Sequence, residues 1–333
     1  MSPTLRPNRS QLLNGSAALL LSGGLLWLFF SRVDLGALAE ALKGLDWRWV
    51  ALAVAVQLLA YLVQALRWRR LIEPEGSSLP YRPLWAATAS GWTFNTLLPL
   101  RLGNVARPWF AARWVSASFP LLLSTAILEM IFDLWAGVVM LGLLLAVWPK
   151  DIAFGGLGAG SGTGMVLLSL GLVLVLLWLS SPRNQAGVVS LLERYPVTKR
   201  WVPHAEDGFA GLATLRSWRA FGSVVLYTLL FWFVWGLAIH VVLVAFGLDM
   251  AWVATLFVEC TLAISTSVPQ GPGFLGVFQW VVDEALRLWS VPAAEAQAVA
   301  LVLWAVSYGP VCMIGIWETY RHEARYRPTV RSS

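Results

Sequence analysis

The chain has few charged side chains, few histidines and almost no cysteine for its length. Of its 333 residues, 13% are Asp, Glu, Lys or Arg, whereas a soluble domain carries about 25%. Its two cysteines, Cys260 and Cys312, lie inside long apolar runs, which argues against a disulfide scaffold. The three histidines are far apart and have no companions at metal-ligand spacing. The sequence therefore predicts no metal, no cofactor and no catalytic residues.

Apolar surface is what the chain has in abundance, because 58% of the residues are hydrophobic and 20 are tryptophan. A water-soluble globule cannot bury so much apolar surface, which predicts an all-α, polytopic integral membrane helical bundle. The apolar runs predict about six full spans, at 12–30, 49–66, 120–148, 165–179, 221–246 and 296–317. Residues 33–48 alternate charged and apolar positions at helical spacing, as a helix at the membrane interface would.

The net charge of +6 follows from membrane topology and gives no reason to expect a nucleic-acid partner. Arginines gather at 67–70, in the loop 182–220 and in the tail 318–333, and Lys and Arg collect on cytoplasmic loops. Both termini are therefore predicted to be cytoplasmic, in an inner or plasma membrane. Arg67, Arg69 and Arg70 are interpreted as one cytoplasmic cluster at the end of the second span.

Two apolar segments, 84–117 and 251–289, are interrupted by proline, glycine and polar residues. The arginine pattern requires each segment to enter and leave on the same side, which predicts a re-entrant hairpin. Span, hairpin and span recur in opposite orientation, so we expect a single membrane domain, 1–333, built from an inverted repeat. Its parts would be a first half at 49–148, a linker span and loop at 149–220, a second half at 221–317 and a basic tail at 318–333. Matching interruptions of this kind indicate a transporter's central site.

Three acidic residues inside apolar segments are predicted to act in gating or proton relay. Glu129 and Asp133 are four positions apart and so share one helix face. A charged side chain at the bilayer centre costs about 2.5–3.5 kcal/mol, so both should face the bundle interior. A structural ion pair that joins two helices is the alternative for these two. Glu259 could pair across the bundle.

The residues around the two interruptions form the predicted substrate-binding site. Arg101 and Arg107 follow the first interruption, and guanidinium groups suit a lipid phosphate. They could instead extend to the interface or pair with Glu129 and Asp133. Backbone groups exposed at the second interruption could bind a polar headgroup, with a plain kinked hairpin as the alternative. The candidates are Asn95, Pro99, Arg101, Gly103, Arg107, Pro269, Pro272, Gly273 and Gly276.

Several motifs, in this order, resemble the flippase-like membrane family, also called the lysylphosphatidylglycerol synthase transmembrane region. They are Ala65-Leu66-Arg67-Trp68, Asn95 with Pro99-x-Arg101-x-Gly103 and Arg107, Glu129 with Asp133, and Pro272-Gly273-x-Leu275-Gly276-Val277. The resemblance covers roughly residues 10–320 and implies a protein that moves a lipid between leaflets. The chain departs from the pattern at Asn104, Met130, Gln279 and Trp304, where an acid, an arginine, a glutamate and an arginine are expected. These departures imply a less charged headgroup, a mechanism without a full proton relay, or another role.

Residues and resemblance together predict a transporter that moves an anionic or glycosylated lipid between leaflets. Its partner would be a membrane lipid, either a phospholipid or a polyprenyl phosphate. The alternative is an intramembrane enzyme or an accessory subunit in polyprenyl-linked or phospholipid biosynthesis, with Glu129 and Asp133 as acid and base in the enzyme. The sequence indicates no particular oligomeric state.

Overall fold

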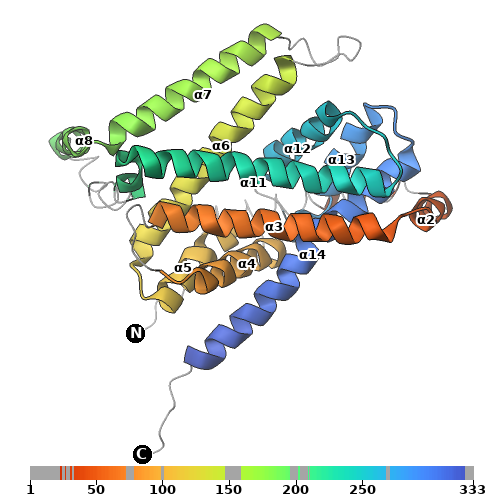
Figure 1. Cartoon of the computed structure of the whole chain (residues 1–333), viewed down its shortest axis with the longest axis horizontal. Helices are drawn as coiled ribbons and strands as arrows, with labels where there is room; N and C mark the ends of the chain where they lie inside the picture. The colour runs from red at the N-terminus through yellow and green to blue at the C-terminus, as the bar shows by residue number, and fades with distance from the viewer. Residues whose placement is uncertain are drawn as a thin grey trace, which may run out of the picture.

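A computed structural model describes residues 34–72, 79–98, 101–146, 159–195, 211–267 and 271–326, with a few isolated positions besides. Every regular element in these ranges is a helix (Figure 1). The predicted all-α, polytopic architecture is therefore confirmed. The predicted first span, at 12–30, lies almost entirely outside the described residues, as does the end of the tail beyond residue 326.

In the first half, two long helices enclose two short helices that are separated by a break. Helix α2 (Leu35–Lys43) precedes it and is capped by Asp34, whose carboxylate accepts hydrogen bonds from the N–H groups of residues 36 and 37 at 2.8 and 3.2 Å. Helix α3 (Trp47–Ile72) begins inside the predicted interface segment, 33–48, and runs past the end of the predicted span, 49–66. The helices that follow α2 are α3 (Trp47–Ile72), α4 (Tyr81–Leu97), α5 (Gly103–Val115) and α6 (Phe119–Ala146).

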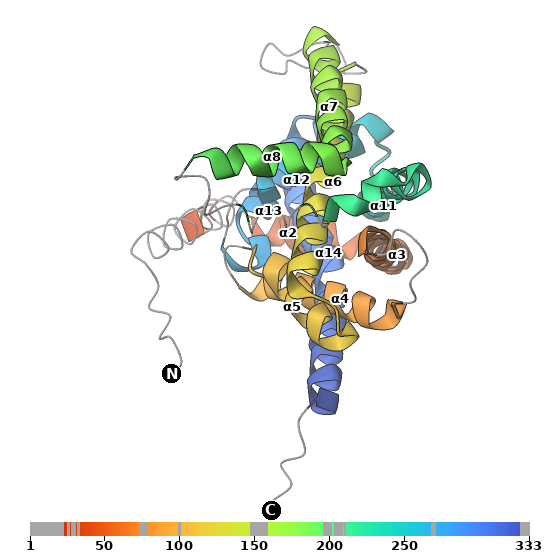
Figure 2. The same cartoon turned by 90° about the vertical axis from the view of Figure 1, so that its left-hand side faces the viewer.

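The second half has the same order of long, short, short and long helices. Its elements are α11 (Trp218–Ala245), α12 (Trp252–Ser267), the 3-10 turn η3 (Pro272–Phe274), α13 (Val277–Arg287) and α14 (Ala293–Tyr326). Helices α3 and α11 lie side by side along their length (Figures 1 and 2). They are antiparallel, because the N–H of Asp46 donates to the carbonyl of Ala245 at 3.0 Å while Arg67 reaches Thr228. The antiparallel arrangement of α3 and α11 agrees with the inverted repeat, which stays a prediction.

The segment between the halves contains more helix than the sequence indicated. Helix α7 (Ala159–Ser180) is followed by α8 (Pro182–Arg194) at an angle of 88°, and the 3-10 turn η2 (Ala213–Arg216) precedes α11. Pro182 occupies the first turn of α8, where its missing N–H costs no helical hydrogen bond. Helices α3, α6, α11 and α14 are long and apolar enough to span a membrane, and the bent pair would make a fifth span.

Both predicted interruptions are breaks between two helices. Arg101 has φ +55° at the first break, and Gly273 and Gly276 have φ +68° and +87° at the second. With ψ −61°, Gly276 adopts a conformation that only glycine tolerates well. Pro99 and Pro269 lie outside the described residues. The broken-helix part of the hairpin prediction is confirmed, whereas hairpin depth and the sidedness of the termini stay predictions.

Candidate functional site

Arg67 lies at the centre of a buried charge cluster that joins α3 to α6. Its guanidinium donates to both carboxylate oxygens of Asp133, at 2.6 and 2.9 Å, and to one oxygen of Glu129 at 2.7 Å. The Arg67 side chain is fully buried, and a buried guanidinium is tolerated when it is paired in this way. The interpretation of Arg67 as part of a cytoplasmic arginine cluster was therefore wrong. The carboxylates on α6 hold it inside the bundle.

Arg107, on α5, engages the other oxygen of Glu129. One of its terminal nitrogens donates to that oxygen at 2.9 Å, and the guanidinium lies 4.0 Å from the ring centroid of Trp68. Its Nε and second terminal nitrogen are buried and make no hydrogen bond to a described residue. Two guanidinium groups thus hold Glu129, while Arg107 keeps N–H donors available.

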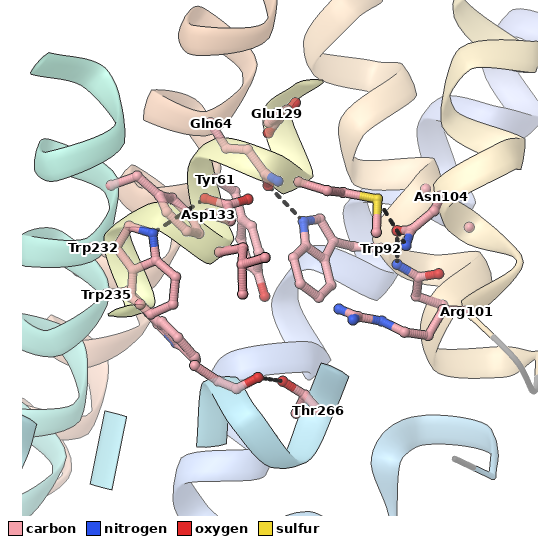
Figure 3. A pocket seen from close by; sticks show the side chains of 18 of the residues that line it. Tyr61, Gln64, Trp92, Arg101, Asn104, Glu129, Asp133, Trp232, Trp235 and Thr266 are labelled. Carbon is pink, nitrogen blue, oxygen red and sulfur yellow. Dashed lines mark hydrogen bonds between the residues drawn. The ribbon is translucent and has the colours of Figure 1, made fainter. Parts of the chain in front are cut away.

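Arg101 brings the two helix breaks together. Its guanidinium lies 5.8 Å from the ring centroid of Phe274, which follows Gly273 in the second break. A Cβ atom built on Gly273 would lie 3.5 Å from the carbonyl oxygen of Thr96, at the end of α4. Hence the breaks from the two halves are in contact, and Arg101 points from this junction toward Trp92 (Figure 3).

A cavity of about 280 Å³ inside the bundle is bordered by Arg101, Arg107, Glu129 and Asp133, whereas Arg67 is outside its lining. Trp92 and Trp235 line it, and Trp232 does so while donating from its indole N–H to Asp133 at 3.2 Å (Figure 3). At one edge the cavity is lined by Met130 and Leu134 of α6 and Ile264 of α12, which are exposed on the outside of the bundle. The cavity therefore reaches the surface of the bundle between α6 and α12.

The structure gathers part of the predicted site around this cavity and leaves four of its described residues outside the lining. Asn95, Arg101, Gly103, Arg107, Glu129 and Asp133 line the cavity. Gly103 lets α5 approach α4, because a Cβ there would collide with the carbonyl oxygen of Gly91. Pro272, Gly273, Gly276 and Glu259 are outside the lining. The Gly276 N–H donates to Gln279 at 2.8 Å, so the second break uses this backbone donor internally.

Glu259 on α12 is buried and separate from the charge cluster. Neither of its carboxylate oxygens makes a hydrogen bond to a described side chain, and a Cβ on Gly236 of α11 would lie 2.6 Å from one of them. The predicted pairing across the bundle is not present among the described residues. A role for Glu259 in gating stays a prediction.

Helix α3 has a polar face that was not predicted from the sequence. Gln57, Tyr61 and Gln64 line the cavity at spacings of four and three residues, on one face of an otherwise apolar helix. Gln64 accepts a hydrogen bond from the indole N–H of Trp92 at 2.8 Å, and Tyr61 donates to the carbonyl of Ser307 at 2.7 Å. That spacing of polar residues inside a membrane span was the signal that could have identified them.

Comparison with known proteins agrees with this architecture. The family described as "Lysylphosphatidylglycerol synthase TM region" matches residues 16–315. The chain belongs to the lysylphosphatidylglycerol synthase transmembrane-region family. This is a family of membrane proteins related to lipid handling, and the family together with the apolar helices of this chain indicates a multi-pass membrane protein. A UPF0104 membrane protein of Methanothermobacter thermautotrophicus is 24% identical over an alignment of 312 residues, and the alignment covers 89% of each chain.

Residues at which the chain departs from the family pattern make uncharged contacts in the structure. Asn104 accepts a hydrogen bond from Asn95 at 3.1 Å, and its own amide nitrogen lies 3.9 Å from the sulfur of Met130. The positions expected to hold an acid and an arginine thus touch one another, and their joint replacement leaves the net charge of the cavity unchanged. The indole N–H of Trp304 donates to the carbonyl of Gly273 at 2.7 Å and so supports the second break.

Proposed function

We propose that this member of the lysylphosphatidylglycerol synthase transmembrane-region family is a lipid transporter that moves an anionic or glycosylated lipid between leaflets. One observation carries the proposal. A cavity lined by Arg101 and Arg107, both with buried nitrogens unpaired among the described residues, reaches the outside of the bundle between α6 and α12. A lipid could place its headgroup there and leave its acyl chains in the bilayer.

The phosphate would lie between Arg101 and Arg107, whose planar guanidinium groups match phosphate oxygens. Arg67 and Glu129 would act as positioning residues, because Glu129 holds Arg107 while Arg67 balances the acids. Since the two breaks meet at Arg101, a movement of one half against the other would alter this site directly. Moving the halves about a fixed central site is the general scheme for transporters with inverted repeats.

The enzyme alternative requires a carboxylate that is free to take a proton. Both oxygens of Glu129 accept hydrogen bonds from guanidinium groups, and both oxygens of Asp133 accept from Arg67. Carboxylate oxygens that already accept charge-assisted hydrogen bonds are poorly placed to take a proton from a substrate. This geometry favours transport over acid–base catalysis.

The test is leaflet exchange of a fluorescent anionic phospholipid in liposomes that contain the purified protein. Arg101→Asn removes the charge, and asparagine tolerates the positive φ at this position better than alanine does. A charged hydrogen bond contributes about 1.5–3 kcal/mol, so we expect exchange to slow roughly 10- to 150-fold. The control is Arg113→Gln, because Arg113 is half exposed, pairs with Glu323 at 3.2 Å and is outside the cavity lining.

Three outcomes of this experiment would count against the proposal. Absence of exchange with the unmodified protein would contradict transport of that lipid. Full-rate exchange in a folded Arg101→Asn variant would remove Arg101 from the mechanism. An equal loss in Arg113→Gln would show that the effect is a general response to removing a positive charge.

A further inference from the structure

Helix α8 lies across one end of the bundle. It turns away from α7 by 88°. It also runs perpendicular to α3, because α3 is seen lengthwise in Figure 1 and along its axis in Figure 2, and α8 the other way round. The 22 residues of α7 rise about 33 Å, which is already enough to cross the hydrocarbon core. Since α3 is long and apolar enough to span a membrane, α8 lies parallel to the membrane plane.

Side chains hold the corner between α7 and α8 in place. The last carbonyl groups of a helix have no partner within it, and at the end of α7 side chains from outside the helix supply the donors. Asn184, Gln185 and Arg216 donate to the carbonyl oxygens of residues 178, 179 and 180 at 2.8, 2.9 and 2.8 Å. The direction of α8 is therefore fixed by three successive hydrogen bonds.

Helix α8 has an apolar face and a polar face. Val188, Val189 and Leu192 share one face at helical spacing, and Arg183 and Arg194 lie on the opposite one. No residue of α8 is buried, and its only substantial contacts with described elements are to α7. The described part of the bundle thus leaves the apolar face incompletely covered.

The surroundings of α8 are positively charged and aromatic. The charged residues described within 181–219 are Arg183, Glu193, Arg194, Arg216 and Arg219. Trp178 precedes α8 and Tyr195 follows it, and the two side chains are 55% and 54% exposed. Aromatic rings of this kind are typical of the membrane–water interface, and arginines near a bilayer surface attract anionic headgroups.

We propose that α8 is an in-plane helix that binds the anionic phospholipid surface of the adjacent leaflet. Its apolar face enters the boundary between headgroups and acyl chains, about 5–10 Å deep. Arg183 and Arg194 engage lipid phosphates from the polar face. The excess of arginine favours this partner over a second copy of the chain, whose α8 would carry the same charges. Because α8 lies between the two halves, the contact holds their linker at the membrane surface. The contact does not depend on what the central cavity carries.

The experiment places an NBD fluorophore on single cysteines of the full chain in liposomes, with Cys260 and Cys312 replaced by alanine. Val188→Cys carries the label on the apolar face and Ser190→Cys carries it on the polar face. We expect a phospholipid with a nitroxide on its acyl chain to quench the label at 188. Iodide present on both sides of the membrane should quench the label at 190 instead.

Two outcomes would overturn the in-plane arrangement. Equal access of iodide to the two labels would mean that α8 lies wholly in water or wholly inside the membrane. A label at 188 that neither iodide nor the nitroxide lipid reaches would show that protein covers the apolar face, for example a second copy of the chain.

Exchanging the nitroxide lipid tests the charge of the partner. Phosphatidylglycerol should be preferred over phosphatidylcholine at position 188 by up to about fivefold for each arginine. High salt and the double variant Arg183→Gln/Arg194→Gln should each lower this preference. The control is a label on Leu170→Cys of α7, an exposed position that precedes the corner by ten residues, where the two lipids should quench equally. Equal quenching at 188, or an unchanged preference in the double variant, would contradict the anionic partner.

Discussion

At the scale of single residues, the burial of Glu129 and Asp133 on α6 depends on Arg67. It contacts both, and Trp232 and Arg107 supply one further bond each. Arg67→Met would leave two carboxylates with one guanidinium between them. Breaking a buried ion pair by removing one partner costs about 3–5 kcal/mol, so we expect a correspondingly lower stability.

Thermal unfolding of the purified protein in detergent measures this loss. The double variant Arg67→Met/Asp133→Asn removes one charge of each sign and leaves Glu129 paired with Arg107. It should be more stable than Arg67→Met alone. If the two variants unfold at the same temperature, the charge balance of the cluster does not account for the effect.

Glu259 differs from Glu129 and Asp133, because its carboxyl group is buried against α11 and has no hydrogen-bonding side chain among the described residues. Glu259→Gln preserves the shape of the side chain and replaces a buried carboxyl group with an uncharged amide, so the variant should be at least as stable as the unmodified protein. If Glu259 is the predicted proton carrier, leaflet exchange should fall about 5- to 150-fold, the range of a typical coupling free energy. Unchanged exchange in a folded Glu259→Gln variant would exclude that role.

At the scale of elements, the contact between α4 and α14 depends on a small residue. A Cβ on Gly315 would collide with Thr93 and with the carbonyl oxygen of Ala89, whereas a Cβ on Gly309 of the same helix meets nothing within 4 Å. Forcing extra volume into a packed contact costs about 1–3 kcal/mol. Gly315→Ala should therefore lower the unfolding temperature, and Gly309→Ala should leave it unchanged or raise it slightly. Equal effects of the two variants would contradict the close packing of α4 and α14.

The elements differ in how far the sequence could predict them. Apolar length alone placed α3, α6, α11 and α14 within a few residues at most ends, because a span must be long and apolar wherever it packs. Arg67 was misplaced because a charge near the end of a span satisfies the topology rule equally well whether it faces water or two acids on another helix. The polar face of α3 was overlooked for a related reason. Uncharged Gln57 and Gln64 hardly alter the hydropathy of the span, and their position beside Trp92 depends on tertiary packing.

At the scale of the whole molecule, the proposed transport depends on a lateral opening between the two halves. Leu134 of α6 lines the cavity and is 62% exposed, whereas Leu143, nine residues further along α6, is 56% exposed and outside the lining. Each position can carry a single cysteine in a chain whose Cys260 and Cys312 are replaced by alanine. A bulky maleimide on Leu134→Cys should obstruct the entry of a headgroup and slow leaflet exchange in liposomes. The same label on Leu143→Cys should leave exchange unchanged, because that side chain faces outward away from the cavity. Exchange that survives complete labelling at position 134 would mean that the lipid enters elsewhere.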